Sequence, residues 1–140
     1  MVESNSLTKQ SLPTKPKHYS DQPVYVRSYT LLKELTTCYS RIPRDLRYTL
    51  GSRMLEAMTD EVMNVSHAFK RQKGKVAFIS DAMVKLEEVQ VYLRLLKDVG
   101  AISTKFFLHT LPITTDVATQ LSAWYRYAQR RETGNVKPAG

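Results

Sequence analysis

The sequence predicts an all-α fold, arranged as an up-down-up-down antiparallel four-helix bundle. Apolar residues recur in steps of three and four along four stretches of the 140-residue chain, and no stretch alternates as a strand would. Short connections marked by proline or glycine separate the stretches, which favours antiparallel neighbours. The length suits one domain. We expect it over residues 23–131, between a flexible N-terminal arm at 1–22 and a flexible C-terminal tail at 132–140.

The first expected helix begins near Pro23 and ends before Pro43. Asp21 is suited to cap it, and proline is well accepted in a first helical turn. Cys38, the only cysteine, falls within this helical pattern and is expected to be a small core residue rather than a nucleophile. A single cysteine allows no internal disulfide, which is typical of a cytoplasmic protein.

The second expected helix covers about residues 45–71 and carries the longest apolar stripe of the chain. Gly51 lies inside it, at a cost of about 1 kcal/mol relative to alanine. We therefore expect another helix or a ligand to approach closely there. Arg53 lies at the edge of the stripe and Glu61 within it, and both are expected to pair with charges across an interface.

The third and fourth helices are expected over about residues 76–99 and 104–131. Gly100 follows the third helix where a left-handed C-terminal cap is expected. Ser103 is a natural N-cap for the fourth helix. Pro112 lies inside the fourth helix and predicts a kink.

The net charge of +8, from 21 basic and 13 acidic residues, suggests a polyanionic partner, and nucleic acid is the usual one. In the predicted bundle the positive charge gathers at the two ends, whereas the middle, which includes Glu87 and Glu88, is acidic. The expected nucleic-acid-binding residues are Arg41, Arg44, Arg47, Arg94, Lys97 and Lys105 at one end, Lys70, Arg71, Lys73, Lys75, Arg126, Arg130 and Arg131 at the other, and Arg53 on the second helix.

No catalytic pattern is visible in the sequence. The three histidines are scattered without a second ligand at helical spacing, and no glycine-rich phosphate loop is present. We therefore expect no enzyme activity, metal or cofactor. No apolar run reaches the roughly 20 residues that span a bilayer, so no membrane segment is expected.

Eight tyrosines are more than one small core needs. Some of them could stack on bases beside the basic ends. Surplus tyrosines on a small bundle more often mark a protein interface, and this second interpretation is favoured. It predicts that the protein is a homo-oligomer.

Residues 42–53 read Ile-Pro-Arg-Asp-Leu-Arg-Tyr-Thr-Leu-Gly-Ser-Arg. This block resembles a pattern of the accessory variability determinant (Avd) proteins of diversity-generating retroelements: an aromatic or aliphatic residue, Pro, a basic residue, two variable positions, Arg, a variable position, Thr-Leu-Gly, a variable position and Arg. Residues 91–103 resemble the second recurring block of that family, and the likeness covers about residues 24–131. A sister family of four-helix bundles, encoded in intervening sequences of 23S ribosomal RNA genes, shares the Pro-basic opening but usually lacks Thr-Leu-Gly.

The resemblance implies a four-helix protomer that assembles into a basic pentamer. It also implies binding to the reverse transcriptase of the element and to its template-repeat RNA, with the cDNA as a further nucleic-acid partner. In such a complex the chain would be a non-catalytic subunit that supports mutagenic cDNA synthesis and mutagenic retrohoming. The alternatives are a member of the 23S intervening-sequence family and a module that acts purely through protein–protein interaction.

Overall fold

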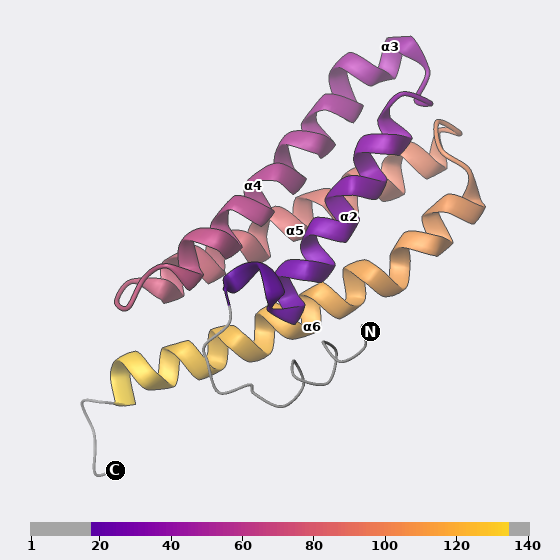
Figure 1. The fold of residues 1–140 in the computed structure, drawn as a ribbon. Coiled ribbons are helices and arrows are strands. Elements are labelled where there is room, and N and C mark those ends of the chain that lie inside the picture. The colour runs from indigo at the N-terminus through magenta and orange to yellow at the C-terminus, as the bar shows by residue number, and fades with distance from the viewer. Residues whose placement is uncertain (1–17, 135–140) are drawn as a thin grey trace, which may run out of the picture.

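The computed structural model describes residues 18–134, and within them the chain forms four long helices and no strand, as the predicted all-α class requires. The long helices are α2 (Pro23–Tyr39), α4 (Ser52–Phe69), α5 (Lys75–Asp98) and α6 (Thr104–Gly134), as Figure 1 shows. Three short elements accompany them: the 3-10 helix η1 (Tyr19–Asp21), the helical turn α3 (Arg44–Leu46) and the π-helical segment η2 (Arg47–Gly51). The remainder of the expected arm and tail, residues 1–17 and 135–140, lies outside the described residues.

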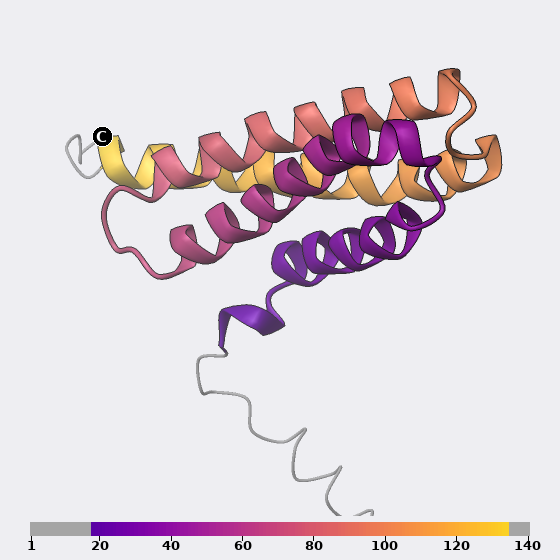
Figure 2. The same ribbon diagram turned by 90° about the horizontal axis from the view of Figure 1, so that it is seen from above.

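The four long helices enclose one apolar core. α4 packs against α5, α5 against α6, and α2 against both α4 and α6. Figure 2 shows α2 and η1 on the side of the molecule away from α5. The largest apolar side chains with almost no exposed surface are Leu31 and Leu35 of α2, Met54, Met58 and Val65 of α4, Ile79, Leu86, Leu93 and Leu96 of α5, and Leu121 of α6, together with Ile42.

Contacts between neighbouring helices follow a regular order. As residue numbers rise along one helix, the numbers of their partners fall along the next. The pairs are Arg27–Asp116 and Glu34–His109 between α2 and α6, Ser28–Glu61 and Tyr39–Ser52 between α2 and α4, His67–Phe78 and Asp60–Lys85 between α4 and α5, and Lys75–Trp124 and Arg94–Phe107 between α5 and α6.

The start of α2 differs from the sequence prediction in one respect. Pro23 is at the first helical position, as expected, but the N-cap residue is Gln22, which makes no side-chain cap bond. Asp21 is not the cap, because it is the last residue of η1. At the other end, α2 stops at Tyr39, and Ile42 is still fully buried beyond it.

The second expected helix is not one continuous α-helix. The Ser52 amide donates to the carbonyl oxygen of Arg47, five residues earlier, which is the π-helical pattern. The Ser52 hydroxyl donates to the same oxygen at 3.1 Å. The chain continues into α4, so the apolar stripe alone does not reveal this wider turn.

The close approach expected at Gly51 is confirmed. A Cβ atom at this buried position would lie 3.1 Å from Cδ1 of Ile42 and 3.3 Å from Cε1 of Tyr39. The element that approaches is therefore the end of α2 with the residues that follow it. Glycine has a packing role here rather than a conformational one, because its φ of −63° is helical.

The connection from α5 to α6 follows the predicted cap chemistry. Gly100 has a φ of +79°, its amide donates to the Lys97 carbonyl, and the Ala101 amide donates to the Leu96 carbonyl at 2.8 Å, which together form a Schellman motif. The Ser103 hydroxyl accepts the Phe106 amide at 3.0 Å, as an N-cap does. α6 then runs through Pro112 without a break, and the kink expected there stays a prediction.

The expectation that Glu61 pairs with a charge across an interface is wrong. Glu61 is fully buried within the chain's own core, where its Oε2 accepts a hydrogen bond of 2.9 Å from the Ser28 hydroxyl. Its Oε1 has no hydrogen-bond partner among residues 18–134. Burial raises the pKa of this carboxyl to about 8, and the bond from Ser28 opposes the rise. Glu61 therefore carries a proton at neutral pH. Arg53, by contrast, is exposed.

Candidate nucleic-acid interface

Two basic regions lie at opposite ends of the helices. We call the first the Arg44 end; it comprises residues 40–47 and 94–105. The second, the Trp124 end, comprises residues 69–75 and 124–132. Figure 1 shows the connections 40–43 and 99–103 close together at one end, and the turn between α4 and α5 at the other. The sequence-predicted basic residues other than Arg53 are thus divided between two regions that the structure separates.

At the Arg44 end, Arg47 is held by the protein itself. Its Nε donates to the Ile42 carbonyl at 3.1 Å, and its Nη2 donates to the Ser40 carbonyl at 3.2 Å. These carbonyls follow the end of α2, where no intrahelical donor remains. Arg47 therefore stabilises the turn into α3, and two of its five N–H donors are engaged in doing so.

Arg94 and Lys97 contact the same aromatic ring at the Arg44 end. The guanidinium carbon of Arg94 lies 5.8 Å from the centre of the Phe107 ring, and the Lys97 ammonium lies 5.0 Å from it. Lys97 also forms an ion pair of 3.1 Å with Asp98. Three further cations, Arg41, Arg44 and Lys105, are exposed. At this end two cations share one buried ring, Phe107, and Arg47 lies 6.0 Å from the exposed ring of the next residue, Tyr48.

The Trp124 end forms a hollow of about 430 Å³ between the α4–α5 turn and the last turns of α6. Its lining combines aromatic rings, basic side chains and few other groups. The lining residues are Phe69, Arg71, Gln72, Lys75, Trp124, Tyr127, Ala128, Arg131 and Glu132. Three of the predicted basic residues therefore come together around one concave surface.

Aromatic rings continue from this hollow towards α2. Phe69 stacks on Trp124 with ring centres 4.4 Å apart. Tyr19 also stacks on Phe69, with ring centres 6.3 Å apart. Tyr25 meets Tyr19 edge to face at 5.3 Å. The row thus joins η1, α2, α4 and α6 along one surface, and none of its rings is fully buried.

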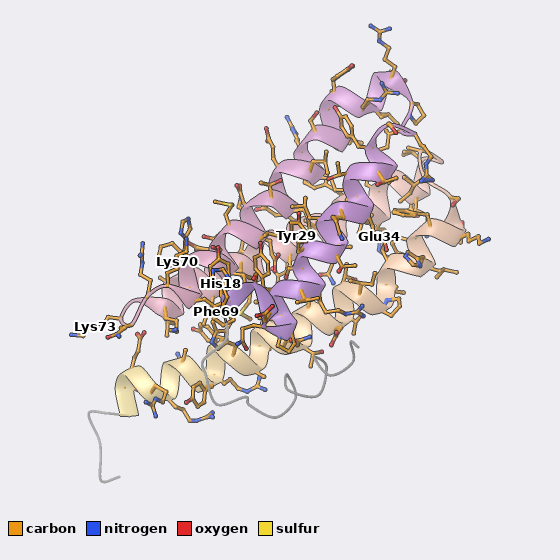
Figure 3. All side chains as sticks on the ribbon, in the orientation of Figure 1. His18, Tyr29, Glu34, Phe69, Lys70 and Lys73 are labelled. Atoms are coloured by element: carbon orange, nitrogen blue, oxygen red, sulfur yellow. The ribbon has the colours of Figure 1, made fainter. Side chains whose placement is uncertain are left out.

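Lysines accompany this row of rings. The Lys70 ammonium lies 5.4 Å from the centre of the Tyr19 ring, and the Lys75 ammonium lies 6.0 Å from that of Trp124. Figure 3 shows His18, Phe69 and Lys70 close together where η1 meets the end of α4, with Lys73 at the tip of the adjoining turn. Proteins that bind single-stranded nucleic acid combine positive charge along the backbone with aromatic faces on which bases stack.

The structure leaves other predicted residues outside this cluster. Arg126 lines a separate hollow with residues of α5 and α6. Arg130 is exposed on α6 but is not part of the lining, and Arg53 lies on α4 outside both ends. Arg27, whose charge would have added to the Trp124 end, forms a 2.8 Å ion pair with Asp116 and holds the pKa of that carboxyl below its usual range.

The middle of the molecule is acidic, in contrast to both ends. A hollow of about 340 Å³ between α4 and α5 is lined by Asp60, Asp81 and Glu88. Lys85 lies among them, 3.8 Å from Asp60 and 3.4 Å from Glu88. No group of three or more His, Cys, Asp or Glu side chains with the geometry of a metal site occurs within residues 18–134. Over the same residues, no helix is long and apolar enough to cross a membrane.

The binding residues expected from the sequence are all basic and include neither Phe69 nor Trp124. A usable signal was nonetheless present on α6. Trp124, Tyr127 and Arg131 recur at steps of three and four, so they share one helix face. Their meeting with Phe69 was not visible, because 55 positions of chain separate it from Trp124.

Neither a protein-family model nor a curated protein matches this chain.

Proposed function

We propose that this chain is a non-catalytic RNA-binding protein that contacts RNA through the Trp124 end. One observation carries the proposal, namely that Arg71, Lys75 and Arg131 surround a hollow walled by aromatic rings. Cations neutralise phosphates without regard to sequence, and aromatic faces stack on unpaired bases. The acidic middle supports the proposal, because it would direct a polyanion towards the ends.

We further propose the specific role that the Avd resemblance implies. The chain would bind the reverse transcriptase and template RNA of a diversity-generating retroelement and support mutagenic cDNA synthesis. Gly51 of the Thr-Leu-Gly block packs tightly against Tyr39 and Ile42, so the glycine of that block has a packing role in this fold. Membership of the 23S intervening-sequence family is the alternative, and a reverse transcriptase gene with paired template and variable repeats beside this gene would decide between them.

We propose an up-down-up-down antiparallel bundle as the architecture of the protomer. The falling order of contact partners along neighbouring helices supports it. Arg27 meets Asp116 and Glu34 meets His109, for example, as α2 and α6 would if they ran in opposite directions. A cytoplasmic location completes the proposal, in keeping with one buried, unpaired cysteine, Cys38.

We propose that the protein acts as a homo-oligomer, and the resemblance favours a pentamer. A row of exposed apolar residues on α5 supports an interface with protein, either another copy or the reverse transcriptase. The row consists of Val84, Val91 and Leu95 of α5 and of Val99, the residue that caps it, and these are between 39% and 64% exposed. By helical position they lie on the side of α5 opposite its buried residues, so this helix is apolar on two sides.

The test of RNA binding is a titration of fluorescently labelled single-stranded RNA at several salt concentrations. We expect the logarithm of the binding constant to fall linearly with that of the salt concentration, by about 0.7 per neutralised phosphate. Reversing charge with Arg71→Glu and Arg131→Glu should weaken binding and flatten this slope. The matched control, Glu87→Lys with Glu88→Lys in the acidic middle, should not weaken binding. Equal loss in both double variants would contradict the assignment to the Trp124 end.

A further inference from the structure

The hollow at the Trp124 end has the dimensions of a binding site rather than of a flat contact surface. Its volume of about 430 Å³ falls within the roughly 300–1,000 Å³ of small-molecule pockets. One wall is formed by α6 and the other by the end of α4 and the start of α5. A smooth duplex surface cannot enter such a hollow, whereas a single extruded group can.

The aromatic part of the wall is held in place by packing. Trp124 is partly buried, and its ring stacks on Phe69 at a centre distance of 4.4 Å and an angle of 28°. Tyr127 lies one turn further along α6 and is 53% exposed. One ring is thus fixed and the other accessible, and together they present apolar faces to the hollow.

The charged part of the lining is strongly biased towards cations. Arg71, Lys75 and Arg131 face one carboxylate, Glu132. Within residues 18–134 no salt bridge joins any of these three cations to an acidic group. Arg131 lies 5.8 Å from the Tyr127 ring, so a positive charge adjoins the exposed aromatic face.

The start of α5 adds to this positive field. Lys75 is the first residue of α5 and also lines the hollow. No acidic residue occupies the first turn of α5, and Gly74 supplies no side-chain cap. The positive end of the helix dipole is therefore not offset at the point where a phosphate would meet Lys75.

We infer that this hollow binds one unpaired nucleotide of single-stranded RNA. The base stacks against Trp124 and Tyr127, and the adjoining phosphates contact Arg71, Lys75 and Arg131. Apolar ligands would leave three cations unused, and inorganic anions would leave two aromatic faces unused. A nucleotide uses both, and only an unpaired one exposes its base. This inference rests on the proposed RNA binding and adds to it a dependence on the base.

The experiment compares two RNAs of equal charge, a 10-mer of uridine and a 10-mer of abasic ribose phosphates. Trp124 is the only tryptophan of the chain, so its intrinsic fluorescence reports directly on the hollow. We expect the uridine 10-mer to bind at least about fivefold more tightly, the lower end of what stacking one base contributes, and to change Trp124 emission. The abasic 10-mer should bind without the emission change.

Variants separate stacking from folding. Tyr127→Ala removes an exposed ring and should reduce the preference for uridine over abasic RNA, with little effect on abasic binding. Tyr48→Ala is the matched control, because Tyr48 is 64% exposed, also has an arginine beside its ring, and lies at the Arg44 end. It should leave the preference unchanged.

Three results would overturn the inference, and they are distinguishable. Equal affinity for both 10-mers without an emission change would contradict the nucleotide site but would still support RNA binding. Absence of binding to either 10-mer removes the proposed function and the site with it. Tighter binding of free uridine monophosphate than of the 10-mer would assign the hollow to a free nucleotide instead of RNA.

Discussion

At the scale of single residues, Glu61 shows how a core can hold a titratable group in its neutral form. Within residues 18–134 its carboxyl has one hydrogen bond, from Ser28, and desolvation is the dominant influence on its pKa. A charged carboxylate would need far more compensation than one hydroxyl offers. Stability should therefore depend on the protonation of this residue.

The first prediction concerns the pH dependence that follows. The folded pKa of Glu61 is about 8, above the ordinary value of 4.5, so its contribution to stability is fully present below about pH 4.5. Between about pH 4.5 and pH 8 the unfolded chain loses this proton while the folded chain retains it. The free energy of unfolding therefore falls across this range. Glu61→Gln removes this titrating group. In urea unfolding from pH 5 to 8.5, the free energy of unfolding of the variant should therefore rise relative to that of the wild type as pH increases.

Glu87→Gln is the control for this experiment, because Glu87 is exposed. Its unfolding midpoint should follow that of the wild type at every pH. Parallel curves for Glu61→Gln and the wild type would contradict the neutral buried carboxyl.

At the scale of elements, η2 determines how the start of the α4 region meets α2. Gly51 lies at its end, against Tyr39 and Ile42. Tyr39 also pairs with Ser52 through their hydroxyls at 3.2 Å. The contact between these two helices therefore depends on having no side chain at position 51.

We predict that Gly51→Leu lowers the free energy of unfolding by about 1–3 kcal/mol, since extra methylenes in a packed site force neighbours to move. Gly51→Ala should be milder, because the gain of about 1 kcal/mol in helix propensity offsets crowding against two side chains that can shift. Denaturant unfolding measures both. Glu56→Leu, at an exposed position of α4, is the control and should stay within about 0.5 kcal/mol. A Gly51→Leu protein with wild-type stability would show that the contact is loose.

At the scale of the whole molecule, the surface carries four features, some of which share residues: two basic ends, an acidic middle and the apolar row along α5. The ends suit a polyanion, and the apolar row suits a protein. The hollow proposed for RNA and the apolar row share no residue, so in the proposed function the two kinds of partner would not compete for the same side chains.

We predict that the purified protein has a mass in solution several times the 16.1 kDa of one chain, with five copies as the expected number. Light scattering coupled to size exclusion measures it. Val91→Lys places a charge in the centre of the apolar row, where the side chain is 64% exposed, and should reduce the mass. Val26→Lys, on exposed surface of α2, should not. A monomer at micromolar concentration would refute self-association.

The sequence alone determined the helices and most of their ends. Helical periodicity is a local property, and so are the cap at Ser103 and the left-handed Gly100, because their partners lie within a few residues. The basic ends also followed from helix order and short connections. The stability cost of a glycine inside a helix predicted a close approach at Gly51. It did not predict which residues would approach.

Only the tertiary structure decided which side chains meet over long stretches of chain. Ser28 and Glu61 are 33 positions apart, and no local pattern pairs a serine with a carboxyl or makes that carboxyl neutral. Likewise, the sequence predicted nucleic-acid binding for all the arginines at the two ends alike. Packing brought Arg47 against the carbonyls that follow α2 and brought Arg71 and Arg131 to one hollow with Trp124. The physical reason is that burial and hydrogen bonding depend on three-dimensional neighbours, which periodicity along one helix does not specify.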